Sequence, residues 1–196
     1  MNKLPRRRAF VKALLADRGD MLVIGGLGSS AWDITHAGDH ANNFPLWGAM
    51  GGAAVLGLGL ALAQPKRRVL VVTGDGEMLM GIGSLATIGA QAPRNLAVVV
   101  LDNERYGETG MQATHTGLGT DLAAVAQAAG IANAMRLSKL SDAATLRRAI
   151  DAMQGPVFAN VKVDAEKLPL VLPPRDGAYL KNRFRVAVLG EAALDA

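Results

Sequence analysis

The sequence predicts a doubly wound α/β fold, in which helices cover both faces of a parallel sheet. Short apolar runs alternate with helical stretches along the whole chain. The runs are uncharged and rich in β-branched residues, which is typical of strands buried on both faces. Half of the 196 residues are hydrophobic and 23 are Gly without a fixed period, a composition that excludes a disordered or fibrous protein. Ligands of such folds bind at the carboxyl ends of the strands.

The first half of the chain alternates helix and strand three times. Apolar residues at helical spacing predict a first helix from Pro5 to Arg18. Continuous apolar runs predict strands at 21–24, 68–73 and 96–101. The stretches 49–64 and 80–92 predict helices, and a proline follows each of them. The polar residues 31–47 are expected to be irregular.

The second half repeats the alternation with two more strands. A loop rich in Gly and Thr is expected at 104–119, and Asp121 and Ser141 are expected to cap helices that end at Gly130 and Met153. Strands are predicted at 134–137 and 157–163, and a last helix at about 178–189. We divide the chain into a domain of residues 1–165 and a Pro-rich tail with a terminal helix, residues 166–196.

Composition excludes several classes of protein. The absence of Cys excludes disulfides, thiolate chemistry and Cys-ligated metals. The net charge of +4 comes partly from basic ends, but these lack interleaved aromatic residues, so we expect no nucleic acid. The uncharged segment 46–63 is rich in Gly and Ala and predicts a packed internal helix, not a membrane span. No signal peptide is visible, so a cytoplasmic location is expected.

Polar residues follow two neighbouring predicted strands. Gly74-Asp75-Gly76 comes directly after the second strand, and Asn103 follows the third, with Tyr106 and Gly107 close behind. Parallel strands would bring Asp75 and Asn103 to one edge of the sheet. Carboxylate and amide oxygens suit Mg²⁺, and the N-terminus of the following helix favours a phosphate group.

Two other patterns leave alternatives open. Residues 26–31 match the G-x-G-x-x-A pattern of NAD-binding Rossmann proteins, but no acidic residue ends a second strand about 20 positions later. His36 and His40 lie four residues apart beside Asp39 and would allow a zinc site, but the segment does not have a helical pattern.

Residues from about 20 to 163 resemble the thiamine-diphosphate-binding domain of 2-oxoacid decarboxylases and acetolactate-synthase-like enzymes. The resemblance implies thiamine diphosphate and Mg²⁺ as cofactors, with Asp75, Asn103 and the backbone oxygen of Arg105 as the metal ligands. In Leu46-Trp47-Gly48-Ala49-Met50-Gly51 it assigns Gly48 to the aminopyrimidine and makes Met50 the bulky residue that bends the cofactor. The cofactor-binding residues that it implies are Ser29, Ser30, Gly48, Met50, Gly74, Gly76, Glu77, Tyr106 and Gly107.

One position departs from the family pattern. Glu77 stands where the family has a small residue, so we expect its N–H to contact phosphate while its carboxylate points away, toward Arg105. His40 is the candidate catalytic residue, as a donor to the keto group or to an anionic head group of the substrate.

Within the family, residues 39–44, 58–65 and 83–88 resemble sulfopyruvate decarboxylase β subunits and the matching half of phosphonopyruvate decarboxylase. This implies decarboxylation of a short 2-oxoacid that carries an anionic group, with the cofactor as the electron sink. A chain of this size has no room for the pyrimidine-binding domain, so the activating Glu is expected on a separate α subunit. Self-association of the β subunit is also expected. The alternatives are a carboligase, a 2-oxoacid oxidoreductase subunit or a non-catalytic binding subunit.

Overall fold

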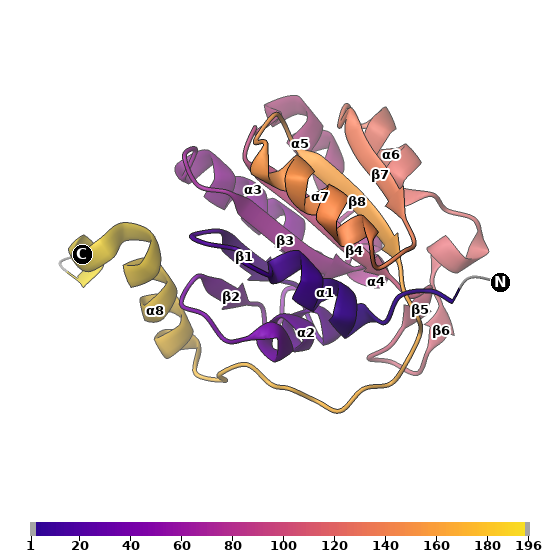
Figure 1. Ribbon diagram of the computed structural model, residues 1–196, viewed down its shortest axis with the longest axis horizontal. Coiled ribbons are helices and arrows are strands. Elements are labelled where there is room, and N and C mark those ends of the chain that lie inside the picture. The colour runs from indigo at the N-terminus through magenta and orange to yellow at the C-terminus, as the bar shows by residue number, and fades with distance from the viewer. Residues whose placement is uncertain (1–2, 195–196) are drawn as a thin grey trace.

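Six parallel strands form one sheet, the five that the sequence predicts and one more, β2 (Figure 1). The computed structural model describes residues 3–194. The first two residues of the predicted domain (1–165) and the last two of the predicted tail (166–196) lie outside the described residues. The strand order is β2-β1-β3-β4-β8-β7. The strands are β1 (Leu22–Gly25), β2 (Asn43–Pro45), β3 (Val69–Gly74), β4 (Leu96–Asp102), β7 (Asn133–Leu137) and β8 (Val157–Lys162).

Helices cover both faces of this sheet and complete the predicted doubly wound fold. The helices are α1 (Arg7–Leu15), α2 (Ser29–Ala37), α3 (Ala53–Ala63), α4 (Asp75–Met80), α5 (Ser84–Gln91), α6 (Leu122–Ala128), α7 (Asp142–Asp151) and α8 (Gly177–Leu189). Helices α1, α2 and α7 pack on one face, and α3, α5 and α6 on the other. Successive residues of β3 alternate between the two cores, with Leu70 on the first face and Val71 on the second, so both faces of the strand are buried.

The apolar segment 46–63 is a packed helix in its second half. Helix α3 lies so close to the sheet that a Cβ on Gly57 would overlap Cγ2 of Val71. Within residues 3–194, no helix has the length and apolar character needed to span a membrane. The small residues of this segment therefore serve close packing of a helix on a strand.

Residues 31–47, which we expected to be irregular, form helix α2 and strand β2. Helix α2 buries Ala31 and Ile34, and it also buries the carboxylate of Asp33, which pairs with arginines of α1. The buried Asp33 interrupts the apolar face of the helix, so the sequence lacks a clear helical spacing of apolar residues. Strand β2 has only three residues at the edge of the sheet, which is too short for a clear periodic signal.

The predicted helix over 80–92 is also wrong in its start, because two short helices occupy the region. Helix α4 begins at Asp75, immediately after β3, and ends at Met80, and α5 follows from Ser84. Acidic residues at Asp75 and Glu77 favour the first turn of a helix, whereas the two glycines of the motif indicated a loop. Gly81 packs so tightly against the backbone of Gly51 that a Cβ there would overlap its carbonyl oxygen.

The C-terminal tail runs from the carboxyl end of β8 along one side of the molecule to α8 (Figure 1). After β8 an extended segment without regular structure runs to α8, which lies beside the β2 edge of the sheet (Figure 1). The rings of Phe44 and Phe184 pack there with centroids 5.2 Å apart. Arg183 donates to Asp39 over 2.6 Å and holds α8 to the end of α2. Helix α8 begins one residue before its predicted range of about 178–189 and ends at the predicted residue.

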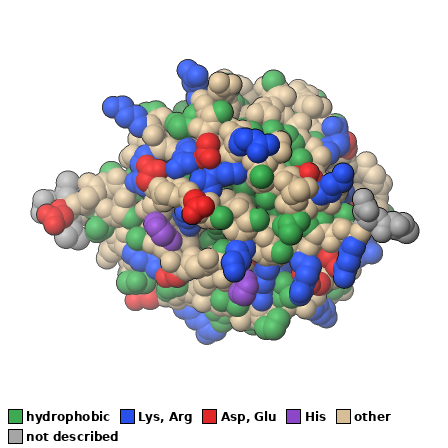
Figure 2. Space-filling model, in the orientation of Figure 1, with side chains coloured by type: hydrophobic (Ala, Val, Ile, Leu, Met, Phe, Trp, Pro, Cys, Tyr) green, Lys and Arg blue, Asp and Glu red, His purple; other side chains and the backbone are tan. Residues whose placement is uncertain are grey.

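The basic N-terminus is used in ion pairs with other segments. Arg6 pairs with Glu166 of the tail at 2.8 Å, while Arg7 and Arg8 both donate to Asp33 of α2. Figure 2 shows basic and acidic side chains interspersed on the face that carries α1 and α7. These arginines therefore hold α1, α2 and the tail together.

Candidate functional site

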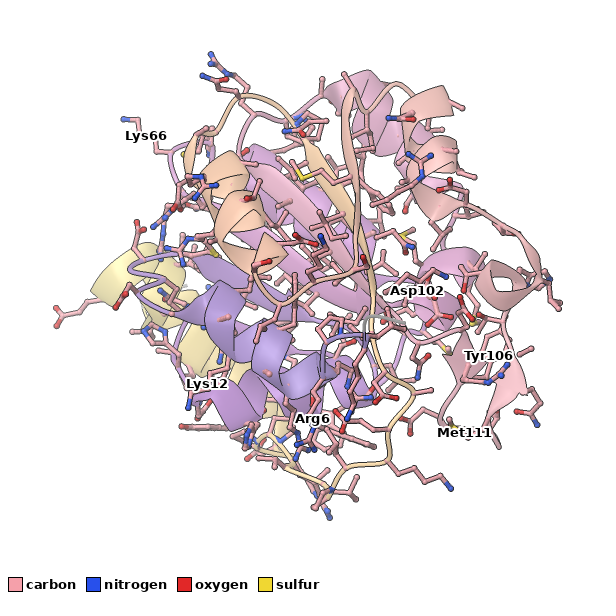
Figure 3. The ribbon with its side chains drawn as sticks, turned by 45° about the vertical axis from the view of Figure 1, so that its right-hand side comes forward. Arg6, Lys12, Lys66, Asp102, Tyr106 and Met111 are labelled. Carbon is pink, nitrogen blue, oxygen red and sulfur yellow. The ribbon has the colours of Figure 1, made fainter. Side chains whose placement is uncertain are left out.

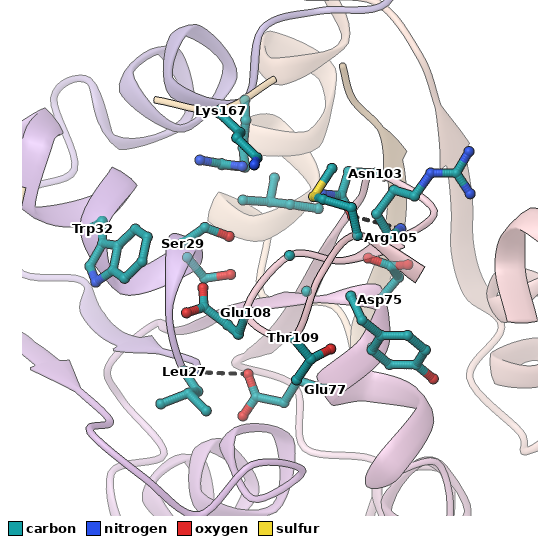
Figure 4. Close-up of a pocket in the computed structure, with 18 of the residues that line it drawn as sticks. Leu27, Ser29, Trp32, Asp75, Glu77, Asn103, Arg105, Glu108, Thr109 and Lys167 are labelled. Atoms are coloured by element: carbon teal, nitrogen blue, oxygen red, sulfur yellow. Dashed lines mark hydrogen bonds between the residues drawn. The ribbon is translucent and has the colours of Figure 1, made fainter. Parts of the chain in front are cut away.

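A cavity of about 290 Å³ opens at the carboxyl ends of β1, β3 and β4 (Figure 4). This is where ligands bind in open α/β sheets, and the volume lies at the lower end of the range for small-molecule sites. The loop after β1 with α2, the loop after β3 with α4, and the segment after β4 all contribute to the wall. That segment contains a small hairpin of β5 (Arg105–Tyr106) and β6 (Gln112–Ala113). Helix α1 and the tail close the remaining side.

The structure brings together nearly all of the residues that the sequence predicts for the site. Those that line the cavity are Ser29, Ser30, Met50, Gly74, Asp75, Gly76, Glu77, Asn103, Arg105, Tyr106 and Gly107. Gly48 and His40 do not line it. The convergence of residues from three separate loops follows from the parallel order β1-β3-β4, which places the three strand ends side by side.

Asp75 is buried at the start of α4 and is held by two threonines. Its Oδ2 accepts a hydrogen bond from Oγ1 of Thr114 at 2.5 Å, and Oγ1 of Thr116 lies 3.2 Å away. Burial raises the pKa of Asp75, and the nearby charge of Asp102 raises it further, against the two threonine hydrogen bonds. Among the described residues Asp75 has no ion-pair partner, so a cation at this position would compensate its buried charge.

A second buried carboxylate supports the first. Asp102 is fully buried at the end of β4, where its oxygens accept from Thr116 at 2.8 Å and from Asn160 at 2.8 Å. Lys162 of β8 lies 2.8 Å from Asp102 and neutralises it. Thr116 therefore connects the ion-paired Asp102 to Asp75, so that the position of Asp75 depends on the end of β8 as well as on its own helix.

The predicted metal ligands fit Mg²⁺ in their chemistry. Asp75, Asn103 and Arg105 lie around one cavity and offer a carboxylate, an amide oxygen and a carbonyl oxygen, all hard ligands. Arg105 donates its N–H to Oδ1 of Asn103 at 3.0 Å, which fixes the turn after β4. An added Cβ on Gly74 or Gly107 would meet nothing within 4 Å, so the backbone is open to the cavity at both positions. A phosphate group has room to approach there.

The alternative zinc site does not assemble. In the part of the chain that the structure describes, no three or more His, Cys, Asp or Glu side chains come together as a metal-binding group. His36 and Asp39 remain surface residues around the end of α2.

The expectation for the side chain of Glu77 is wrong. Its carboxylate points away from Arg105 and instead accepts from Oγ1 of Thr73 at 2.7 Å and from the N–H of Leu27 at 3.1 Å (Figure 4). The side chain is buried, burial raises its pKa, and Oε1 has no hydrogen-bond partner among the described residues. Glu77 thus joins the loop after β1 to the loop after β3. This orientation could not be predicted locally, because Leu27 lies 50 residues before Glu77 in the chain.

The N-terminus of α2 faces the cavity with Ser29 and Ser30 in its first turn. The preceding Gly28 has φ of 73°, a conformation that favours glycine, and the carboxylate of Glu108 lies directly beside it. Figure 4 shows Glu108 next to Ser29. The N–H groups of this helix end are favourable for an anion, and Glu108 brings a negative charge to that position.

Met50 and its neighbours form the exposed rim of the site. Met50 lines the cavity and is 37% exposed, and Trp47 is 42% exposed. The indole N–H of Trp47 donates to the carbonyl of Pro174 at 2.8 Å and ties this rim to the tail. Gly48 lies on the same exposed segment but outside the cavity wall.

His40 lies on the surface, in the turn between α2 and β2. Its Nδ1 accepts the N–H of Asn42 at 3.0 Å. Partial burial and the charges of Arg18 and Arg183 lower the pKa of His40, although Asp39 opposes them. The neutral imidazole is therefore favoured at neutral pH.

Several residues of the cavity have no counterpart in the sequence prediction. The polar, aromatic and Met residues among them are Arg7, Trp32, Glu108, Thr109, Met111, Glu166 and Lys167, together with Thr114 and Thr116 behind Asp75. The pair Thr114 and Thr116 could have been noticed, because two hydroxyls two residues apart follow the polar loop after β4. Arg7 and the tail residues carry no local signal, since only the folded chain brings them to the strand ends.

The comparison with family models matches residues 24–161 to "Thiamine pyrophosphate enzyme, C-terminal TPP binding domain". This range contains all of the predicted site residues and excludes α1 and the whole tail with α8.

Curated relatives extend the similarity over nearly the whole chain. The chain is 40% identical over 171 residues to sulfopyruvate decarboxylase subunit beta of Methanothermobacter thermautotrophicus, which covers 87% of this chain and 89% of the relative. It is 39% identical over 186 residues to phosphonopyruvate decarboxylase of Streptomyces viridochromogenes, covering 94% of this chain and 46% of that longer protein.

The solved structures agree on the fold. Benzoylformate decarboxylase from Polynucleobacter necessarius superposes with a TM-score of 0.67 at 20% identity, over 84% of this chain and 34% of that one. At this identity the likeness concerns the fold alone.

Proposed function

Because the chain belongs to the thiamine pyrophosphate enzymes, as their C-terminal TPP-binding domain, we propose that it is the small subunit of a thiamine-diphosphate-dependent 2-oxoacid decarboxylase. The observation that carries the proposal is the convergence of Asp75, Asn103 and Arg105 with Ser29 on one cavity at the strand ends. The two relatives described above, both decarboxylases by name, favour this outcome over a carboligase or an oxidoreductase.

The chain's own residues would hold the diphosphate end of the cofactor and its metal. Asp75, Asn103 and the carbonyl of Arg105 would ligate Mg²⁺, because all three offer oxygen to the same cavity. The open backbone at Gly74 and Gly107, with the first turn of α2 at Ser29, would receive the phosphate oxygens. Tyr106 packs over Gly76, where an added Cβ would lie 2.7 Å from the ring, and so fixes the hairpin to α4.

Bound thiamine diphosphate supplies the electron sink that decarboxylation of a 2-oxoacid requires. The chain contributes orientation and a low-dielectric surrounding, because Asp75, Ser30 and Glu77 are buried on the cavity wall. Met50 would support the cofactor from its exposed rim.

We propose that a separate α subunit docks on this rim and supplies the activating Glu. Exposed apolar side chains lie on the segment of Met50 and on the neighbouring helices α3 and α4, with Met80 62%, Val55 49%, Trp47 42% and Met50 37% exposed. Apolar patches of this kind next to a half-open site mark an interface with another chain. The name of the relative from Methanothermobacter, a beta subunit, supports the same arrangement. Self-association of the small subunit and a cytoplasmic location stay predictions.

The substrate that we propose is a short 2-oxoacid with an anionic group, such as sulfopyruvate or phosphonopyruvate. These are the compounds in the names of the relatives. A panel of 2-oxoacids offered to the assembled enzyme would identify the preferred one and would separate aldehyde release from carboligation.

A binding titration tests the cofactor site directly. Calorimetric titration of the α–β complex with thiamine diphosphate and Mg²⁺ should show binding that Asp75→Asn weakens at least tenfold. Asp17→Asn is the matched control, since Asp17 is an exposed carboxylate that does not line the cavity. Binding of NAD, or equal cofactor binding by the Asp75→Asn variant, would contradict the proposal.

A further inference from the structure

The wall of the cavity contributed by α1 and the tail is basic and does not belong to the matched domain. Arg7 and Lys167 line the cavity, yet both lie outside residues 24–161, the range that matches the cofactor-binding domain. In Figure 4, Lys167 lies on the side of the cavity opposite Glu77. Both residues are thus additions to the part of the chain that enzymes with different substrates share.

The guanidinium of Arg7 is buried and only partly used. Its side chain is 7% exposed, and its Nε donates to Asp33. Among the described residues, neither Nη1 nor Nη2 of Arg7 has a hydrogen-bond acceptor. Both amino groups keep some accessible surface, and an Arg fork held at Nε with its two amino groups open at a cavity wall is suited to a bidentate oxyanion.

The charge balance around Arg7 also favours an anion. Asp33 is shared between Arg7 and Arg8, and Glu166 accepts from Arg6 at 2.8 Å. Arg7 and Lys167 are the cations that line this side of the cavity, and the two carboxylates near them, Asp33 and Glu166, also pair with Arg8 and Arg6. The carboxylate of Glu108 lies elsewhere on the wall, beside Gly28 at the start of α2.

We propose that Arg7 and Lys167 form a subsite for the tetrahedral oxyanion of the substrate, a sulfonate or a phosphonate. The inference rests on the proposed function and adds the residues that select the substrate class. A tetrahedral oxyanion is also present in the cofactor's diphosphate, but the residues within 24–161 already provide for that group. Helix α1 and the tail lie outside the shared cofactor-binding domain, so their residues are placed to recognise the part of the substrate that differs between enzymes of the family.

The test uses the α–β complex and the exposed residue of the pair. Lys167→Gln should raise KM for sulfopyruvate or phosphonopyruvate at least tenfold, and should leave KM for pyruvate and the Kd for thiamine diphosphate within twofold. Arg7→Lys keeps a charge beside Asp33 but loses the bidentate fork, and it should act in the same direction. Lys12→Gln, on the same helix as Arg7 and away from the cavity, is the matched control (Figure 3).

Three outcomes separate the sources of the anion and the two proposals. A rise in the Kd for thiamine diphosphate with equal changes for all 2-oxoacids would assign Arg7 and Lys167 to the cofactor and overturn the subsite. Unchanged kinetics in both variants would also overturn it. If the complex binds the cofactor but decarboxylates no 2-oxoacid, the proposed function fails. Calorimetric titration with methylphosphonate then tests the subsite by itself. Binding that is tenfold weaker to Lys167→Gln than to the unsubstituted complex supports the subsite, and equal binding or no binding overturns it.

Discussion

The hydroxyl of Thr114 donates to Oδ2 of Asp75 over 2.5 Å, in a part of the structure where both side chains are buried. This contact joins the segment after β4 to the start of α4, 39 residues away. A carboxylate that is to hold a cation gains a fixed orientation from such a partner, as ligand-supporting hydrogen bonds generally do.

Removal of this hydroxyl should weaken metal binding. Thr114→Val is expected to reduce the Mg²⁺ affinity of the cofactor-loaded complex about tenfold, because the loss of such a supporting hydrogen bond typically costs 10–100-fold. Calorimetric titration with Mg²⁺ measures it, and Thr114→Ser should restore the affinity. Thr145→Val on the exposed side of α7 serves as control. Equal affinity in Thr114→Val would show that Asp75 is positioned without Thr114.

The buried ion pair between α1 and α2 should matter for stability. Asp33→Asn leaves Arg7 buried without its charged partner and is expected to lower the free energy of unfolding by about 3–5 kcal/mol. Urea denaturation measures the change. Arg136→Gln is the control, since the pair of Arg136 with Asp121 is exposed and should contribute less than about 1 kcal/mol. Similar losses in the two variants would contradict this ranking.

The pKa of His40 should lie below its ordinary value of 6.5, because partial burial and Arg18 disfavour the charged imidazole. For a depressed pKa the contribution to stability is present above pH 6.5 and is lost as the pH falls through the folded value. NMR titration of the ring proton measures the pKa. Arg183→Gln should raise it and Asp39→Asn should lower it, since the two charges act in opposite directions. A midpoint above 6.5 in the unsubstituted protein would refute the expected direction.

The candidate catalytic role of His40 has its own test. Because His40 does not line the cavity, His40→Ala is expected to leave kcat/KM of the α–β complex within twofold. Steady-state kinetics with the preferred 2-oxoacid measures it. A loss of more than tenfold would instead support the role predicted from the sequence, with His40 reaching the substrate in the assembled enzyme.

The isolated chain should have no decarboxylase activity. The activating Glu is expected on the partner, and the described chain leaves the rim around Met50 open. Release of CO₂ from 2-oxoacids should appear only after the α subunit is added. Turnover by the purified chain at a normal enzymatic rate would show that a second subunit is unnecessary.

Strands β3, β4 and β8 could be predicted because each is a continuous apolar run buried on both faces, which local composition reveals. Helix α8 is similarly clear, because Asp176 caps it and proline-rich sequence precedes it. Helix α2 could not be predicted in the same way. The burial of Asp33 depends on arginines about 25 residues earlier in the chain, and no local pattern contains that pairing.

The sequence by itself determined the doubly wound fold and the motif residues at the ends of β3 and β4, because both depend on residues close to each other in the chain. Tertiary structure alone decided where the charged side chains point. It turned Glu77 toward Leu27, set Thr114 against Asp75 and brought Arg7 to the cavity. Hydrogen bonds and ion pairs act over a few ångströms in space, so residues far apart in the sequence become partners only once the strands have set the loops side by side.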